Sequence, residues 1–394
     1  MYSTVLLLLL FSKLVETNST LSNIDAKSGF VTPRKSVEPV RVGGRRLKYV
    51  HAIWKHGDRA PKQLSYPDDK YDMTYWPRGW GQITNLGMKQ MRDLGHYFRT
   101  TYADHFISSE YDRDEVRVKS SSDSRALTAA QAFLYGLFPP IEDHEFFDHT
   151  LNWQPIPVHS FGTEESDVML RPTGFLCPAY ENIKDKVITA VEIDLLTKYA
   201  DLVEFLRPII YPGMENPPKL RLRDITRLVD IQREIVHNLT QPSWVRKRWP
   251  QYARKSTLDI VFEMRLVERN AESSNPSLSY LAGGLLLGDW LRKLQSIGRR
   301  ETVRPSKMML YSAHDATLVS LLYLLQANWD GYKLLFRRAG LNEKLILKGC
   351  IRSCPLDKFL NLLRASAIYN TESLSKVTHC NAEHCVYVYF KSTE

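Results

Sequence analysis

The chain has 394 residues, of which 43% are hydrophobic and 25% are charged, and its formal net charge at pH 7 is +9. These proportions are ordinary for a soluble globular protein, and the absence of repeats and low-complexity tracts excludes a fibrous chain. The charge suggests a polyanion partner, but much of it lies in residues 34–48, which lack the aromatic side chains that stack on bases. We therefore expect no nucleic-acid partner.

The N-terminal segment begins with an apolar run at residues 5–11, which fits the hydrophobic region of a signal peptide and is too short to span a bilayer. We expect a signal peptide over residues 1–17, followed by a flexible basic arm over residues 18–46. No later stretch approaches about 18 consecutive apolar residues. The mature protein is thus expected to have no transmembrane anchor and to be secreted or lysosomal (lumenal).

A predicted strand at residues 47–54 runs directly into the turn Lys-His-Gly-Asp-Arg-Ala-Pro at residues 55–61. This turn places His56 where a buried parallel strand would stop, with a cation on each side. Such cations would bind phosphate oxygens. They would also lower the pKa of the imidazole, which keeps the ring neutral and nucleophilic in mild acid.

Three strand–turn–helix junctions follow the same plan. After the first, a helix capped by Thr84 is predicted to extend to Tyr102. The second has a strand at residues 115–119, a serine-rich turn at 120–125 and a helix at 126–137, and the third has a strand at 308–313, His314 with Asp315, and a helix at 316–326. In a mostly parallel sheet the carboxyl ends of the strands share one edge, so His56, Lys119, His314 and Asp315 are expected to meet over one pocket.

Between residues 151 and 283 the pattern changes to helices joined by proline-rich connections, with almost no strand signal. The helical segments are predicted at residues 188–205, 224–239 and 258–269. We expect an α/β catalytic domain of residues 47–150 and 284–394, with residues 151–283 inserted as a smaller α-helical cap over the pocket.

The chain has five cysteines, Cys177, Cys350, Cys354, Cys380 and Cys385. The two close pairs, with His379 and His384 nearby, resemble metal ligands, but an oxidising compartment favours disulfides, so we expect no metal. The sequon at Asn238 is a predicted glycosylation site in that setting.

Several ordered sequence blocks resemble the histidine acid phosphatases of the phosphoglycerate-mutase-like superfamily, which include prostatic, lysosomal and secreted nematode acid phosphatases. The blocks are residues 55–61, 76–87, 153–159, 312–317 and 349–356. The resemblance covers about residues 47–380. It implies a three-layer α/β/α fold with a mostly parallel sheet.

The resemblance implies that His56 is the nucleophile that accepts the phosphoryl group, and that Asp315 donates a proton to the leaving alkoxide. Acid catalysis by Asp315 would favour low pH, where the carboxyl group is protonated. The implied phosphate pocket is completed by Lys55, Arg59, Lys119 and His314. No cofactor is implied; the expected substrate is a small-molecule or peptide phosphomonoester, and a homodimer is possible.

The resemblance also implies a disulfide between Cys350 and Cys354 and a second between Cys177 and Cys380. Spacing favours Cys380 over Cys385 as the partner of Cys177. The chain departs from the family in having Lys55 and Lys119 where the family has arginine. An ammonium group keeps the charge but loses the planar fork that holds two phosphate oxygens. The sequence therefore predicts an acid phosphatase whose activity the changes at Lys55 and Lys119 would reduce; the alternative is an inactive secreted pseudo-phosphatase that binds phosphorylated ligands.

Overall fold

The computed structural model describes residues 7–12, 41–42, 45–162, 167–172, 177–325 and 354–370. Its centre is a five-stranded sheet in the order β1-β4-β9-β5-β6. The strands are β1 (Leu7–Ser12), β4 (Tyr49–Lys55), β5 (Val116–Ser120), β6 (Val158–His159) and β9 (Met308–Ala313). Neighbouring strands are parallel except β1, which is antiparallel to β4. The sheet is therefore mostly parallel, as predicted.

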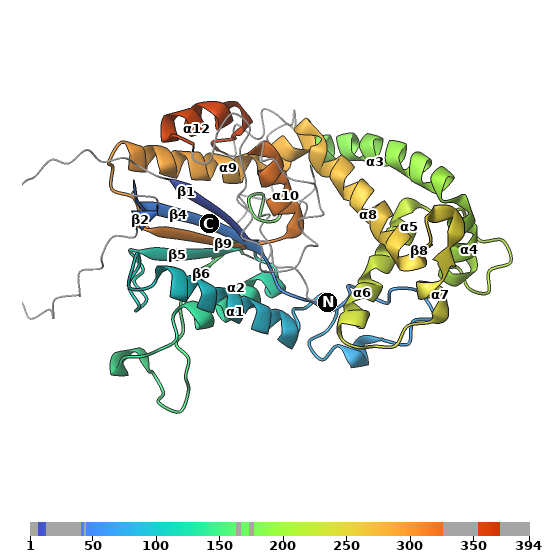
Figure 1. Ribbon diagram of the computed structural model, residues 1–394, viewed down its shortest axis with the longest axis horizontal. Helices are drawn as coiled ribbons and strands as arrows, with labels where there is room; N and C mark the ends of the chain where they lie inside the picture. The colour runs from blue at the N-terminus through green and yellow to red at the C-terminus, as the bar shows by residue number, and fades with distance from the viewer. Residues whose placement is uncertain are drawn as a thin grey trace, which may run out of the picture.

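Helices cover both faces of this sheet and make three layers (Figure 1). One face carries α1 (Asn85–Tyr102) and α2 (Ser124–Leu137), and the other carries α9 (Pro276–Gly298), α10 (Asp315–Leu324) and α12 (Leu356–Leu363). Alternate residues of β4 supply the two cores: Trp54 packs with Phe133 of α2, and Ile53 packs in the cluster of Trp290 of α9. This alternation is what a strand buried on both faces requires.

The remaining helices form a second body beside the sheet, with an apolar core of its own (Figure 1). They are α3 (Pro178–Lys198), α4 (Ala200–Ile210), α5 (Leu222–Thr226), α6 (Ile231–Val236), α7 (Ser243–Arg246) and α8 (Thr257–Ser274), with a short hairpin of β7 (Arg248–Trp249) and β8 (Lys255–Ser256). Residue 283, the expected end of the insertion, lies within α9.

Several short elements complete the description. They are β2 (Arg41–Val42) paired with β3 (Arg45–Arg46), and the 3-10 helices η1 (Met73–Tyr75), η2 (Asp143–Glu145), η4 (Arg227–Asp230), η5 (Pro250–Tyr252) and η6 (Arg364–Ser366). The strand β1 falls inside the expected signal peptide, whose removal stays a prediction. Among the described residues, no helix is both long enough and apolar enough to cross a membrane.

The cysteines give a mixed result. Cys177 precedes α3 as a buried free thiol, packed among Tyr180 and Leu278, so the structure does not contain the predicted bridge from Cys177 to Cys380. Cys354 is disulfide-bonded. Cys350 and Cys380, like Cys385, lie outside the described residues, so the pairing of Cys350 with Cys354 stays a prediction.

Candidate active site

The carboxyl end of β4 places His56 at the edge of the sheet, where its backbone N–H donates to the carbonyl of Ala313 over 3.2 Å. The side chain is only 6% exposed. The following residue, Gly57, lies against the start of α1, and a Cβ there would be 2.2 Å from the carbonyl oxygen of Gly87. Only two glycines permit this approach, which fixes the turn against α1.

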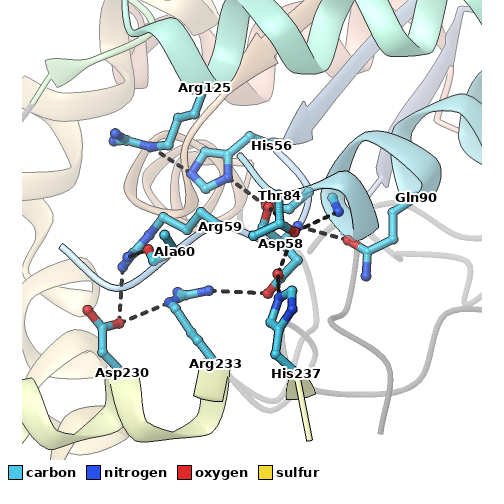
Figure 2. Close-up of polar contacts among 12 residues, drawn as sticks. His56, Asp58, Arg59, Ala60, Thr84, Gln90, Arg125, Asp230, Arg233 and His237 are labelled. Carbon is cyan, nitrogen blue, oxygen red and sulfur yellow. Dashed lines mark hydrogen bonds and ion pairs between the residues drawn. The ribbon is translucent and has the colours of Figure 1, made fainter. Parts of the chain in front are cut away.

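Two hydrogen bonds define the tautomer of His56. Its Nδ1 lies 2.8 Å from the carbonyl oxygen of Gly57, which can only accept, so Nδ1 carries the proton. The Nε2 atom accepts from Nε of Arg125 over 3.0 Å (Figure 2). Burial, and then the charges of Lys55 and other neighbouring cations, hold the pKa of His56 well below its ordinary value. The ring is therefore neutral, with the lone pair of Nε2 directed toward a cation, as the sequence predicts.

Arg125 is the site residue that the sequence analysis missed. It lies in the first turn of α2, and Asp123 holds its guanidinium with two contacts of 2.8 Å, from Nη1 to Oδ1 and from Nη2 to Oδ2. Such a paired contact fixes the planar group in one orientation. The available signal was an arginine directly after the serine-rich turn, at the same strand end as Lys119.

Lys119 itself lies elsewhere. In β5 it is in register with Tyr311 of β9, and the ionisable groups on which its charge acts include Asp167 and Lys293. Within the described part of the chain, no polar contact joins Lys119 to His56. The strand β5 ends one residue after Lys119, at Ser120, and the chain then turns into α2. Arg125, in the first turn of α2, is the cation that contacts the imidazole.

The third junction brings His314 and Asp315 to the same edge. The rings of His56 and His314 are 5.6 Å apart and nearly perpendicular, and His314 Nε2 lies 2.8 Å from the hydroxyl of Ser121. Burial, followed by the charge of Arg125, lowers the pKa of His314 to about 4. This histidine is therefore neutral in mild acid.

Asp315 is the first residue of α10, and its carboxylate accepts from the N–H of Ala316 over 3.0 Å. Burial alone would raise the pKa of Asp315, but the cations around it, Lys55 foremost, hold that pKa far below its ordinary value. These cations thus keep Asp315 ionised even in mild acid, which differs from the protonated carboxyl group expected from the sequence. A bound phosphate dianion would offset these cations and favour protonation of Asp315.

Lys55 is the last residue of β4 and is enclosed in the site. Burial lowers the pKa of Lys55 to about 8, against the opposing attraction of Asp315. Its side chain is therefore still charged in acid, although the ammonium group has no planar fork for phosphate oxygens.

Arg59 completes the set that the sequence predicted. Its Nη1 donates to the carbonyl of Ala60 over 2.7 Å, and its Nη2 donates to Oδ1 of Asp230 over 3.2 Å (Figure 2). Burial and then the charge of Arg233 lower the pKa of Arg59 to about 10, so it remains charged. Contacts and charge interactions therefore connect Lys55, His56, Arg59, His314 and Asp315. Those found for Lys119 run to Asp167 and Lys293, and its place in the pocket stays a prediction.

Asp58 turns away from the imidazole and holds the loop. Its Oδ2 accepts from the hydroxyl of Thr84 and from Nε2 of His237, each over 2.8 Å, and its backbone N–H donates to Gln90 over 2.8 Å. The cations around His56 are suited to a dianion. Among the described residues, no group of three or more histidine, cysteine or acidic side chains is placed to hold a metal ion.

A neutral histidine at a strand end, surrounded by cations, defines a site for phosphoryl chemistry on a mostly parallel α/β fold. The sequence matches the family model described as "Histidine phosphatase superfamily (branch 2)" over residues 46–344, and the chain belongs to this family.

Curated relatives and solved structures agree with this assignment. Prostatic acid phosphatase of Rattus norvegicus is 30% identical over 343 residues, covering 81% of this chain and 86% of that protein. Lysosomal acid phosphatase of Homo sapiens is 31% identical over 345 residues, covering 81% and 77%. Apo phytase of Hafnia alvei has a TM-score of 0.59 at 16% identity, covering 85% of this chain and 99% of that one, which confirms the expected fold.

Proposed function

We propose that the protein is a histidine acid phosphatase that hydrolyses phosphate monoesters through a phosphohistidine at His56. The observation that carries this proposal is the tautomer of His56: Nδ1 donates to the Gly57 carbonyl, which leaves the proton-free Nε2 to accept from Arg125. A neutral imidazole held in this way is an activated nucleophile for an anionic phosphorus centre.

The reaction has two steps. In the first, Nε2 of His56 attacks phosphorus, the bond from phosphorus to the ester oxygen breaks, and the departing alkoxide takes the proton of Asp315. In the second, water attacks the phosphohistidine, its proton passes to the Asp315 carboxylate, and the bond from nitrogen to phosphorus breaks. The pair returns to its starting state, with inorganic phosphate released.

The phosphate oxygens would be held by Arg125 and Arg59 as guanidinium donors, by the ammonium group of Lys55, and by His314. These groups are fixed before substrate arrives, Arg125 by Asp123 and Arg59 by Asp230. Donors fixed in this way stabilise the charge that develops in the transition state without reorganisation. The incoming dianion also supports proton uptake by Asp315, because it offsets the charge of Lys55.

The setting we propose follows from the same relatives. The substrate is a small-molecule or peptide phosphomonoester, and the protein is secreted or lumenal. The helical cap remains proposed as residues 151–283, although its end falls within α9. Asn238 is exposed in a turn with a φ of 59°, which supports glycosylation there. A homodimer remains part of the proposal through the family resemblance alone.

A second candidate function is an inactive pseudo-phosphatase that binds phosphorylated ligands. The observation in its favour is Lys55, which offers no fork of donors beside the nucleophile. Losing one fixed donor at a site of developing charge costs about 2.7–4 kcal/mol, and the remaining charge recovers part of this. The contact between Arg125 and His56 favours the active phosphatase over the pseudo-phosphatase.

The test is hydrolysis of p-nitrophenyl phosphate between pH 4 and 7 by the wild type and by His56→Ala. We expect turnover in acid that the substitution abolishes, because it removes the only group that would form the covalent intermediate. Single-turnover reactions with radiolabelled substrate, stopped in alkali, should leave an acid-labile phosphate on the wild type alone.

The matched control is His96→Ala, which removes an exposed histidine of α1. Equal rates for the wild type and His56→Ala would contradict the phosphatase. Tungstate, a tetrahedral dianion, separates the second candidate: a rise in melting temperature without turnover would identify the pseudo-phosphatase.

A further inference from the structure

A layer of ion pairs from the helical body lies directly behind Arg59. Asp230 ends η4, just before α6, and its Oδ1 accepts from two guanidiniums: Nη2 of Arg59 at 3.2 Å and Nε of Arg233 at 3.0 Å. Its Oδ2 accepts from the backbone N–H of Lys62 over 3.2 Å. One carboxylate from outside the sheet therefore holds both the side chain and the backbone of the loop that follows His56.

The same layer continues to the other side of the loop. Nη1 of Arg233 lies 3.8 Å from Oδ1 of Asp58, and Nε2 of His237 donates to Oδ2 of that carboxylate over 2.8 Å. Figure 2 shows the resulting row of alternating charges, from Arg59 through Asp230 and Arg233 to Asp58. The side chains of this row are 2–20% exposed, so solvent screens their interactions weakly.

Arg59 needs such a partner because its other charged neighbours repel it. The charges of Arg233 and Arg125 act against the protonated form of Arg59, and Asp230 acts in its favour. The charges of Arg59 and Arg233 in turn offset burial and lower the pKa of Asp230 to about 2. The carboxylate therefore stays ionised throughout mild acid, and Arg59 keeps its partner there.

We propose that Asp230 is a positioning residue for the phosphate pocket: it holds the guanidinium of Arg59 in place, and Arg233 connects this hold to Asp58. The inference rests on the proposed function, since Arg59 is taken to bind phosphate. In this arrangement the helical body sets the affinity of the pocket for phosphate without touching the substrate.

The experiment compares wild type, Asp230→Asn, Arg59→Ala and the double variant at pH 7, with tungstate affinity measured by calorimetry. Asp230→Asn keeps the shape of the side chain and removes its charge. We expect Asp230→Asn to bind tungstate at least about tenfold more weakly than the wild type does, because Arg59 loses its charged partner. In the Arg59→Ala background the same change should have almost no further effect.

Kinetics and a control complete the design. If the wild type turns over p-nitrophenyl phosphate, Asp230→Asn should raise KM more than it lowers kcat and should leave the acid limb of the pH profile in place. Asp201→Asn changes an exposed acid of α4 and should leave tungstate affinity unaltered. Arg233→Met tests the connection to Asp58 and should weaken binding in the same direction.

The outcomes are distinct. Unchanged or tighter tungstate binding by Asp230→Asn, or equal losses in both backgrounds, would overturn the inference while leaving the phosphatase intact. A wild type whose tungstate affinity depends on Asp230, but which shows no turnover, would refute the phosphatase and keep the inference. If Asp230→Asn does not fold, the tungstate affinity of Arg233→Met becomes the test. An affinity equal to that of the wild type would overturn the inference.

Discussion

At the residue scale, the contact between Arg125 and His56 sets the chemistry of the site. The guanidinium is 3.0 Å from Nε2 of His56 and is held on its other side by Asp123. In the proposed reaction it would therefore bind the phosphoryl oxygens as soon as the ester arrives. Lys119, six residues earlier, has no such position.

We expect Arg125→Ala to lower kcat on p-nitrophenyl phosphate about 10²- to 10³-fold, because a fixed donor at a site of developing charge is lost. Lys119→Met is the matched control and should change kcat less than about threefold, since the groups on which the charge of Lys119 acts include Asp167 and Lys293. Steady-state kinetics at pH 5 provides the measurement. A comparable loss in both variants would show that Lys119 belongs to the pocket after all.

Lys55 gives the site a pH dependence that an arginine would not. The pKa of Lys55 is lowered to about 8 by burial, so the ammonium group loses its charge as pH rises through that value. We expect the affinity for tungstate to decline above about pH 8 in the wild type and to decline only at higher pH in Lys55→Arg. Titrations at pH 6, 7, 8 and 9 measure this.

The comparison needs Lys119→Arg as its control, because that change should leave the decline where it is in the wild type. If Lys55→Arg and the wild type lose affinity at the same pH, a different group controls binding in that range. The double change of Lys55 and Lys119 to arginine should then gain nothing over Lys55→Arg.

The sequence could predict the residues at the strand ends, because a parallel sheet gathers its carboxyl ends at one edge. His56, His314 and Asp315 follow from this rule. Arg125 does not, because the direction of a side chain in the first turn of α2 depends on how the preceding turn closes. Asp230 was equally out of reach, since its partner Arg59 lies far from it in the sequence.

At the element scale, the crossing of α1 and α2 depends on two glycines. A Cβ on Gly95 would lie 1.9 Å from the carbonyl oxygen of Phe133, and one on Gly136 would lie 2.1 Å from that of Arg92. Each helix therefore presents bare backbone to the other. Apolar spacing predicts both helices, but it does not show that these glycines face each other.

The helical body shows where periodicity misleads. The segment predicted as one helix over residues 224–239 consists of α5, η4 and α6. The change to a 3-10 turn brings Asp230 to Arg59. The segment predicted over residues 188–205 is divided at Tyr199, whose φ of −113° and ψ of 35° separate α3 from α4. Tertiary contacts thus decide boundaries that local spacing cannot.

At the scale of the whole molecule, a buried acid makes stability depend on pH. Glu234 of α6 is fully buried and accepts from the hydroxyl of Ser65 and the amide of Gln241. Burial is the main reason that its pKa is raised to about 7, with the negative charge of Asp69 adding to the effect. Since the folded state favours the protonated form, the stabilising contribution is complete below about pH 4.5 and is lost as pH rises through 7.

We expect Glu234→Gln, which stays neutral, to be more stable relative to the wild type at pH 8 than at pH 5, by roughly 2–3 kcal/mol. Thermal unfolding at the two pH values measures the difference. Glu204→Gln, at a side chain that is 64% exposed, is the control and should show no such dependence. An equal effect of Glu234→Gln at both pH values would contradict the titration of Glu234.

The sequence predicted the sheet and its helical layers better than it predicted the pairing of β1 and the domain boundary. Three strand–turn–helix junctions were enough to indicate a mostly parallel sheet between helical layers, because each junction carries its own local signal. The antiparallel pairing of β1 with β4 has no such signal, since a short apolar run is as typical of an edge strand as it is of a signal peptide. The boundary placed at residue 283 falls within α9, and helical spacing alone does not mark where one domain ends.

The hydrogen bond from Arg125 to Nε2 also means that the lone pair of the proposed nucleophile already has a partner. An uncharged electrophile has nothing with which to draw the guanidinium away, so it meets a nitrogen whose electron pair is already engaged. The oxygens of a phosphate ester are better acceptors for the guanidinium. Binding of the ester would therefore free the lone pair of Nε2 next to the phosphorus atom. In the proposed reaction, the step that forms the bond to Nε2 would therefore favour anionic substrates over uncharged ones.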